Sequence, residues 1–138
     1  SRDGVIENGY ITIIDDCYNA NPVSVKGGID TLANFKGRKI AILGDMKELG
    51  TNSKQLHFDT GKYVKDKAID ILIAIGTDAV DIAEGSKGSD TEVIYFETVE
   101  QALPELKSII NKDDTILVKA SRAMKLENVV NVLKEITE

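Results

Sequence analysis

Five short runs rich in Ile, Val and Leu divide this chain, and amphipathic stretches lie between them. We expect strands over residues 10–15, 39–43, 69–75, 92–96 and 115–119. Most of these runs are apolar almost throughout, as is typical of strands buried on both faces of a parallel sheet. Strands that alternate with helices predict an α/β fold. The expected architecture is an open, doubly wound sheet of five mainly parallel strands with helices on both faces.

Two features modify a plain β-α repeat. Residues 5–6 precede Glu7-Asn8-Gly9, which predicts a hairpin turn and hence a short antiparallel edge strand before the first parallel one. Pro104 interrupts the apolar stripe over 99–110, so that helix should kink or restart there, because proline lacks a backbone N–H. The last helix has the clearest apolar face, formed by Leu126, Val129, Val130, Leu133 and Ile136.

Length and charge narrow the class of protein. The chain has 138 residues, 42% of them hydrophobic, which fits one globular domain spanning residues 1–138. A net charge of -6 argues against nucleic acid or a membrane surface as an electrostatic partner. The single cysteine, Cys17, excludes an intrachain disulfide and favours a cytoplasmic location. Apolar runs are too short for membrane insertion. Because the sequence opens on Ser1-Arg2 without an initiating Met, we expect a fragment of a longer protein.

Function is expected at the carboxyl ends of the strands, where ligands bind in open α/β sheets. Three of the loops that follow strands are unusually polar, and they cover residues 15–22, 44–50 and 119–122. The other two, 76–78 and 97–98, have the composition of simple helix caps.

The first polar loop offers carboxylates and amides together. Strand alternation directs Asp15 and Asp16 to opposite sides, so one of them should face the crevice. Tyr18, Asn19 and Asn21 add a ring hydroxyl and two amides, a set that suits a ribose, an amide or a carboxylate. The structural alternative is that one Asp caps the next turn and the other pairs locally.

The third polar loop is cationic. Lys119, Ser121 and Arg122 at the start of a helix favour an anion such as a carboxylate or phosphate. The structural alternative is that Lys119 pairs with Asp15 or Asp16 across the sheet edge.

The remaining candidates favour structural roles. Asp45 and Glu48 would make only a weak oxygen site for a metal, so an ordered turn is preferred and no metal site is assigned. The lone His57 is interpreted as a solvent-facing or satisfied structural histidine, and Cys17 as a packing residue. The chain has no G-x-x-x-x-G-K-[ST] or G-x-G-x-x-G motif, so this domain is not expected to hold a nucleotide alone.

Taken together, the three loops closely resemble the carboxyl-terminal domain of the Mur ligases. The resemblance is carried by residues 14–22 with Ser24, by 43–46 and 48–50 with Ser53, His57 and Gly61, and by 117–119 with 121–122. It runs from Arg2 essentially to the end of the chain, and that domain of the family is Rossmann-like. Within the family, the branch resembled adds D-Ala-D-Ala to UDP-N-acetylmuramoyl-tripeptide in peptidoglycan precursor synthesis.

The resemblance implies a three-domain, ATP-dependent ligase. The preceding amino-terminal and central domains would bind the uridine nucleotide substrate and most of ATP and Mg²⁺, and this domain would close over the site. ATP would activate the tripeptide carboxylate as an acyl phosphate, which the amine of D-Ala-D-Ala then attacks.

The resemblance also implies roles for individual residues, although no catalytic residue is assigned in this domain. The residues on the nucleotide side are Asp16, Tyr18, Asn21 and, at the domain junction, Arg2. Those on the dipeptide side are Asn19, Lys119, Ser121 and Arg122. Ala120 departs from the family glycine, which would shift the loop if that glycine approaches the ligand or takes positive φ. Cys17 stands where Ser is common.

Two other hypotheses remain open from the sequence. A phospho-acceptor receiver domain also needs paired Asp residues after the first strand and a Lys after the fifth, here Asp15, Asp16 and Lys119. It further needs an Asp that ends the third strand, where this chain has Ala74-Ile75-Gly76. A nucleotide-binding or interaction domain without a catalytic parent is the third hypothesis.

Overall fold

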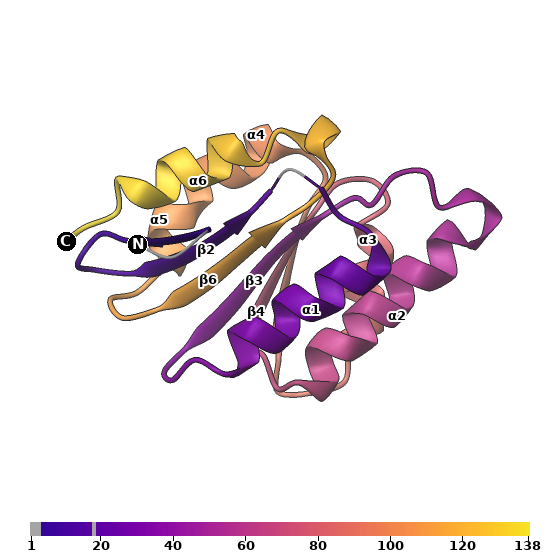
Figure 1. Cartoon of the computed structure of the whole chain (residues 1–138), viewed down its shortest axis with the longest axis horizontal. Coiled ribbons are helices and arrows are strands. Elements are labelled where there is room, and N and C mark those ends of the chain that lie inside the picture. Colours follow the sequence, from indigo (N-terminus) through magenta and orange to yellow (C-terminus); the bar gives the residue numbers. More distant parts are fainter. Residues whose placement is uncertain (1–3, 18) are drawn as a thin grey trace.

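Residues 4–17 and 19–138 are described by the computed structural model, and six strands of these residues form one sheet in the order β1-β2-β6-β3-β4-β5 (Figure 1). The strands are β1 (Val5–Glu7), β2 (Thr12–Asp16), β3 (Lys39–Gly44), β4 (Ile71–Ile75), β5 (Glu92–Phe96) and β6 (Thr115–Lys119). The helices are α1 (Pro22–Ala33), α2 (Ser53–Asp66), α3 (Val80–Gly85), α4 (Val99–Ala102), α5 (Leu106–Ile109) and α6 (Glu127–Lys134). β1 pairs antiparallel with β2, and the other neighbours are parallel, as predicted.

Strand boundaries were predicted closely at the carboxyl ends and less well at two amino ends. β2 begins at Thr12 because the Asn8 side chain accepts the N–H groups of Tyr10 and Ile11 at 2.9 Å and folds them into the hairpin turn. β4 begins at Ile71 because the Ile69 N–H donates to the Val64 carbonyl and so still belongs to the end of α2.

Two hydrophobic cores lie on opposite faces of the sheet. Helices α4, α5 and α6 cover one face, where Ile13, Ile116 and Val118 point. Helices α1, α2 and α3 cover the other face, where Ile14 and Leu117 point (Figure 1). The inner strands β3, β4 and β6 therefore bury both of their faces, which explains why their sequence runs are apolar almost throughout.

The predicted helical irregularity is present. α4 ends at Ala102, a 3₁₀ turn spans Leu103–Glu105, and α5 begins at Leu106, so the helix restarts at Pro104. The five apolar residues of the last stripe are all buried in the core under α6. None of the described helices has the length and apolar character needed to cross a membrane.

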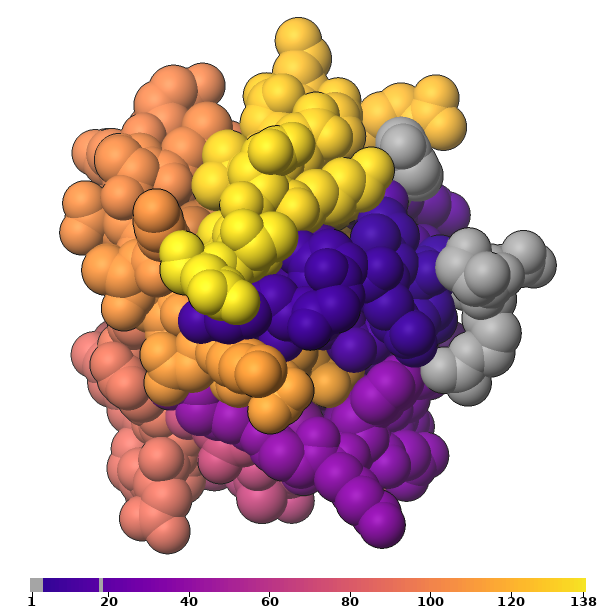
Figure 2. Space-filling view, turned by 90° about the vertical axis from the view of Figure 1, so that its left-hand side faces the viewer, coloured from indigo at the N-terminus to yellow at the C-terminus, as the bar shows by residue number. Residues whose placement is uncertain are grey.

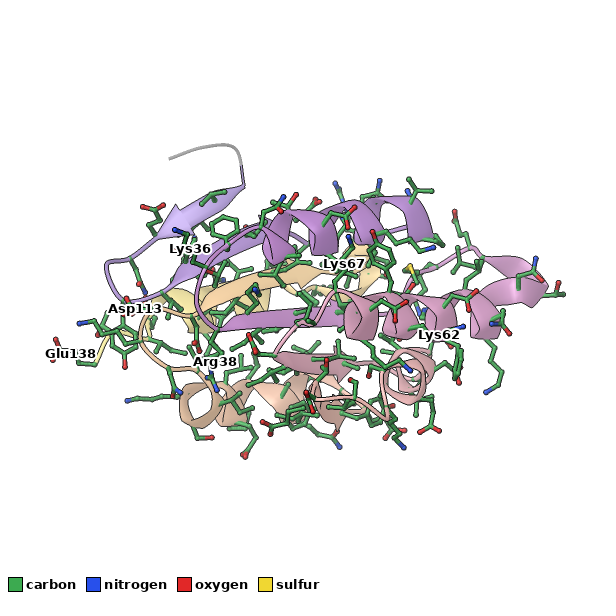
Figure 3. The ribbon with its side chains drawn as sticks, turned by 90° about the horizontal axis from the view of Figure 1, so that it is seen from below. Lys36, Arg38, Lys62, Lys67, Asp113 and Glu138 are labelled. Carbon is green, nitrogen blue, oxygen red and sulfur yellow. The ribbon has the colours of Figure 1, made fainter. Side chains whose placement is uncertain are left out.

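Polar contacts stabilise the end of the sheet at which the parallel strands begin. The guanidinium of Arg38, which Figure 3 labels, donates to both oxygens of the buried Asp114 carboxylate, at 2.9 and 2.8 Å, just before β3 and β6 begin. Asn8 donates to the Ile136 carbonyl at 2.9 Å, so the β1–β2 hairpin lies against the carboxyl-terminal segment (Figure 2). The polar loops lie at the opposite end of the sheet, where the parallel strands end.

Candidate functional site

The carboxyl ends of β2 and β6 bring Asp16 and Lys119 into contact. The two residues are register partners in the parallel pair. The Lys119 ammonium donates to the Asp16 carboxylate and, at 3.1 Å, to the Asn19 carbonyl. Only 1% of Lys119 is exposed, whereas 56% of the Asp16 side chain is. Pairing of Lys119 with Asp16, the structural alternative raised from the sequence, is therefore confirmed.

A glycine in α1 makes room for the Lys119 stem. Lys119 and Leu117 point to the α1 face of β6. A Cβ at Gly28 would lie 3.3 Å from the Lys119 Cδ and equally close to the Leu117 methyl groups. Glycine here lets the helix pack close to the strand, and the lysine stem runs beneath it.

Asn21 begins α1. Its side-chain oxygen accepts the Ser24 N–H at 2.9 Å, the Ser24 hydroxyl accepts the Asn21 N–H at 3.0 Å, and Pro22 occupies the first turn. This capping box fixes the direction in which the loop leaves Asn19.

Asp15 lies on the other side of β2, as alternation predicts. It follows Ile13 towards the α6 face and neighbours Cys17, which is fully buried. Burial, reinforced by Asp15, raises the pKa of the Cys17 thiol to about 12. The thiol is therefore protonated at neutral pH, and Cys17 is a packing residue, as interpreted from the sequence.

Two hollows border the loops at this end of the sheet. The one of ≈ 540 Å³ borders Asp16, and its lining comprises Gly4, Val5, Ile14, Asp15, Asp16, Ser24, Gly27, Gly28, Thr31 and Leu117. The one of ≈ 400 Å³ is bordered by Asp45, Gly76, Thr77, Glu97 and Lys125, among others. Carboxylate oxygens beside the first hollow can accept hydrogen bonds from ligand hydroxyl groups such as those of a ribose.

Asp45 connects three loops, a role that sequence reasoning missed. Its backbone carbonyl accepts the Ser121 N–H at 3.0 Å, and its carboxylate accepts the Ala79 N–H at 2.8 Å. The expectation that residues 76–78 form a simple helix cap was wrong, because the α3 cap comes from Asp45 in another loop. Such a long-range cap leaves no local pattern in the sequence.

His57 is a satisfied structural histidine. It is fully buried, its Nε2 accepts the Met46 N–H at 3.0 Å, and its Nδ1 lies 2.7 Å from the Ser53 carbonyl. One ligand atom from each of Asp45, His57 and Asp78 lies within 4.8 Å of the others. Both ring nitrogens are already hydrogen-bonded, so this group does not fit a metal ion without breaking those contacts.

The third polar loop, residues 119–122, lies at the same end of the sheet. Ser121 is buried, and among the described residues its Oγ has no hydrogen-bond partner. Arg122 is exposed at the start of a 3₁₀ turn, Arg122–Met124. Ala120 is buried without positive φ, and its methyl group lies where a Cβ at Gly44 would come within 2.7 Å. The alanine therefore fills space above Gly44 in the core.

Of the eight residues assigned to the site from sequence, Arg2 and Tyr18 lie outside the described residues. The structure places Asp16, Asn19 and Lys119 in one contact cluster, with Asn21 capping the helix that follows. Ser121 joins this edge through Asp45. The contribution of Gly28 was missed, although two adjacent glycines inside a helix are a costly choice that signals a close approach.

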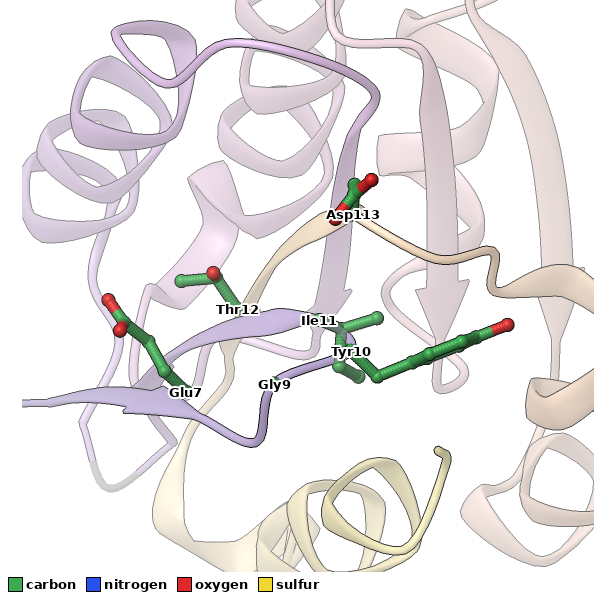
Figure 4. Close-up of a pocket in the computed structure, with 6 residues that line it drawn as sticks. All are labelled: Glu7, Gly9, Tyr10, Ile11, Thr12 and Asp113. Carbon is green, nitrogen blue, oxygen red and sulfur yellow. The ribbon is translucent and has the colours of Figure 1, made fainter. Parts of the chain in front are cut away.

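A further hollow, of ≈ 200 Å³, lies at the opposite end of the sheet. It is lined by Glu7, Gly9, Tyr10, Ile11, Thr12 and Asp113 (Figure 4). Its place at the amino ends of β2 and β6 separates it from the polar loops, so it is not part of the candidate site.

Comparison with known proteins agrees with the sequence motifs. Residues 2–122 match the family model described as "Mur ligase, glutamate ligase domain". The chain is 34% identical over 131 residues to the "UDP-N-acetylmuramoyl-tripeptide--D-alanyl-D-alanine ligase" of Haemophilus influenzae and 36% identical over 129 residues to that of Bacillus subtilis. Each alignment covers 91% of this chain and 28% of the relative, so the chain spans less than a third of their length.

Solved structures show the same fold. The structure titled "MurF from Acinetobacter baumannii" superposes with a TM-score of 0.87 at 32% identity, and covers 95% of this chain and 30% of that one. The "MurF ligase from Thermotoga maritima in complex with ADP" superposes with a TM-score of 0.80 at 31% identity, over 95% of this chain and 30% of that one. The Rossmann-like fold expected from the sequence is confirmed.

Proposed function

The chain belongs to the Mur ligase family, and from that premise we propose that it is the carboxyl-terminal domain of an ATP-dependent amide-bond ligase. The parent enzyme would add D-Ala-D-Ala to UDP-N-acetylmuramoyl-tripeptide in the cytoplasm. Relatives named for that reaction cover nine tenths of this chain. The observation that carries the proposal is the contact cluster of Asp16, Asn19 and Lys119 at the carboxyl ends of β2 and β6, where Asp16 also borders a hollow between β2 and α1.

On the nucleotide side, the proposal gives Asp16 the ribose hydroxyls. Its side chain is 56% exposed although one oxygen pairs with Lys119, so a carboxylate oxygen is available to accept ligand hydroxyls. Asn21 borders the same loop, and its cap uses only the amide oxygen, which leaves the NH₂ group for a ligand acceptor. Tyr18 and Arg2 are proposed for this side from the family resemblance.

On the dipeptide side, the proposal gives the free carboxylate of D-Ala-D-Ala to Arg122, whose planar guanidinium matches a carboxylate in two hydrogen bonds. Ser121, Asn19 and Lys119 are proposed for this side from the family resemblance. Held in this way, the dipeptide amine would be positioned for attack on the activated carboxyl group, a contribution from orientation and not from a reacting side chain.

Mg²⁺ and most of the contacts to ATP are proposed to belong to the other domains of the parent chain. The ligand atoms of Asp45, His57 and Asp78 cluster, but His57 and Asp45 already accept backbone N–H groups, so the cluster does not fit the ion. When bound to ATP, Mg²⁺ neutralises phosphate charge. The role of this domain is to close over the nucleotide and exclude water from the acyl phosphate.

The test is ATP-dependent ligation by the full-length parent protein. We expect phosphate release that requires ATP, UDP-N-acetylmuramoyl-tripeptide and D-Ala-D-Ala together, and a strong loss of activity in Asp16→Ala and Asp16→Asn. The same change at the exposed Asp90, Asp90→Asn, serves as the control. Wild-type rates in both Asp16 variants would remove Asp16 from the site. Stable aspartyl phosphorylation of the chain by acetyl phosphate would instead support a receiver domain and overturn the ligase proposal.

A further inference from the structure

We propose that Lys119 is a positioning residue for the nucleotide side of the site, and that it does not itself touch the dipeptide. Its buried ammonium joins the end of β2 to the loop that follows and holds both in the shape that receives the nucleotide. This inference rests on the proposed function and changes the part assigned to Lys119 within it.

The burial of Lys119 argues against direct ligand contact. Only 1% of the residue is exposed, and its ammonium already donates to the Asp16 carboxylate and the Asn19 carbonyl. A buried ammonium that loses such partners carries a large desolvation penalty. A dipeptide carboxylate would have to displace Asp16 to reach the Lys119 ammonium. The Arg122 side chain, by contrast, is exposed.

The two contacts of Lys119 fix the Asp16 side chain and the loop that leads from Asp16 to the Asn21 cap. The ion pair holds the Asp16 side chain in one orientation while more than half of that side chain stays exposed to a ligand. The contact to the Asn19 carbonyl, at 3.1 Å, fixes the backbone three residues beyond the strand end and just before the Asn21 cap. A single ammonium thereby joins the group proposed for the ribose to the loop that carries Tyr18.

The path of the stem keeps the ammonium in place. Lys119 runs beneath α1 at Gly28, where an added Cβ would be 3.3 Å from the Lys119 Cδ. A side chain at position 28 would therefore press on the stem, and the glycine leaves Lys119 the space that it occupies. Rigid support of this kind is what a functional side chain needs from the residues behind it.

The first test uses Lys119→Met in the full-length enzyme, because methionine keeps most of the stem and removes the charge. We expect the KM for ATP to rise by on the order of tenfold or more, the usual effect of losing a charge-assisted hydrogen bond. The KM for D-Ala-D-Ala should rise less than the KM for ATP, because Lys119 contacts only the backbone of Asn19 on the dipeptide side. Lys112→Met, in the exposed loop just before the same strand, is the matched control and should change neither constant.

A rise in the dipeptide KM with an unchanged KM for ATP would overturn the proposal and return Lys119 to the dipeptide. If the wild-type parent performs no ligation, the proposed function fails, and the positioning role of Lys119 is tested on this chain alone. Amide hydrogen exchange at residues 17, 19 and 20 should then be faster in Lys119→Met than in Lys112→Met. Equal exchange rates in the two variants would refute the proposal that Lys119 holds this loop.

Gly28→Ala keeps the inference testable if Lys119→Met does not fold. The added methyl group presses on the Lys119 stem without removing the charge. We expect the same direction of change as in Lys119→Met, but smaller, in the exchange rates and in the KM for ATP. An ATP KM and exchange rates equal to those of wild type would contradict a role for the stem in holding this loop.

Discussion

Gly76 shows how a single backbone conformation supports the site edge. Its φ is +127°, a region that residues with a side chain rarely adopt, and an added Cβ would lie 2.6 Å from the carboxylate carbon of Asp45. Glycine therefore both permits the turn after β4 and admits the carboxylate that caps α3.

Replacing Gly76 should cost more stability than replacing a glycine that has positive φ alone. Gly88 is the matched control, because its φ is +86° and no heavy atom lies within 4 Å of an added Cβ. Backbone strain costs roughly 1–3 kcal/mol at either position, and Gly76→Ala adds the clash with Asp45. Urea unfolding of Gly76→Ala and Gly88→Ala would measure the difference, and equal losses would show that the Asp45 contact contributes nothing.

Cys17 gives a pH-dependent prediction. Burial and Asp15 raise the pKa of its thiol from 9.0 to about 12, so the folded protein binds this proton more tightly than the unfolded chain does. The resulting contribution to stability is complete below pH 9 and is lost as the pH rises towards 12.

Alkylation of Cys17 measures the same shift. At pH 8 the thiolate fraction should be about 1000-fold lower in the folded chain than in the unfolded one, because each pKa unit changes it tenfold. Iodoacetamide should therefore label the native protein only through unfolding, and labelling should speed up in denaturant. Rapid labelling of the native chain at neutral pH would contradict the burial of this thiol.

At the scale of elements, Gly61 in α2 lets α2 and α3 pack closely. A Cβ at Gly61 would lie 2.9 Å from the Ser86 nitrogen and closer still to the Ile82 carbonyl, so the two helix backbones are nearly in contact there. Gly27 in α1 is the opposite case, because nothing lies within 4 Å of an added Cβ.

These two glycines should respond to alanine with opposite signs. Gly61→Ala forces the helices apart and should destabilise the fold by about 1–3 kcal/mol or more, the cost of overpacking. Gly27→Ala should stabilise the fold by roughly 0.5–1 kcal/mol, because alanine lowers the conformational entropy of the unfolded chain. Thermal unfolding monitored by circular dichroism would compare them, and destabilisation by both variants would disprove the argument from packing.

The same contrast explains what the sequence could predict. Local patterns gave the strands, the hairpin and the helix restart at Pro104, because each depends on nearby residues. The pairing of Asp16 with Lys119 was foreseen as one of two options, since both residues end neighbouring strands. The cap that Asp45 gives to α3 joins residues 34 positions apart, and no local signal marks it. Which polar residue serves a ligand and which serves the fold therefore depended on tertiary contacts.

At the scale of the whole molecule, the two ends of the sheet differ in how exposed their charged side chains are. The half-buried Arg38 pairs with the buried Asp114 where the strands begin, whereas the side chains of Asp16 and Arg122 are exposed where the strands end. An edge of this kind can complete a pocket that another domain begins. It lacks a glycine-rich loop for the phosphates of ATP, since neither phosphate-binding motif occurs in the sequence.

We therefore expect this 138-residue chain to fold by itself but to show no ATP-dependent ligation. Transition-state stabilisation of phosphoryl transfer depends on groups placed around the γ-phosphate, whereas the contacts proposed for this chain are to the ribose and the dipeptide. The measurement is phosphate release with ATP, the UDP-linked tripeptide and D-Ala-D-Ala, using the full-length parent as the positive control. Turnover by the chain alone that disappears in Asp16→Asn would mean that the site is complete within one domain, and the proposal of a shared pocket would have to be abandoned.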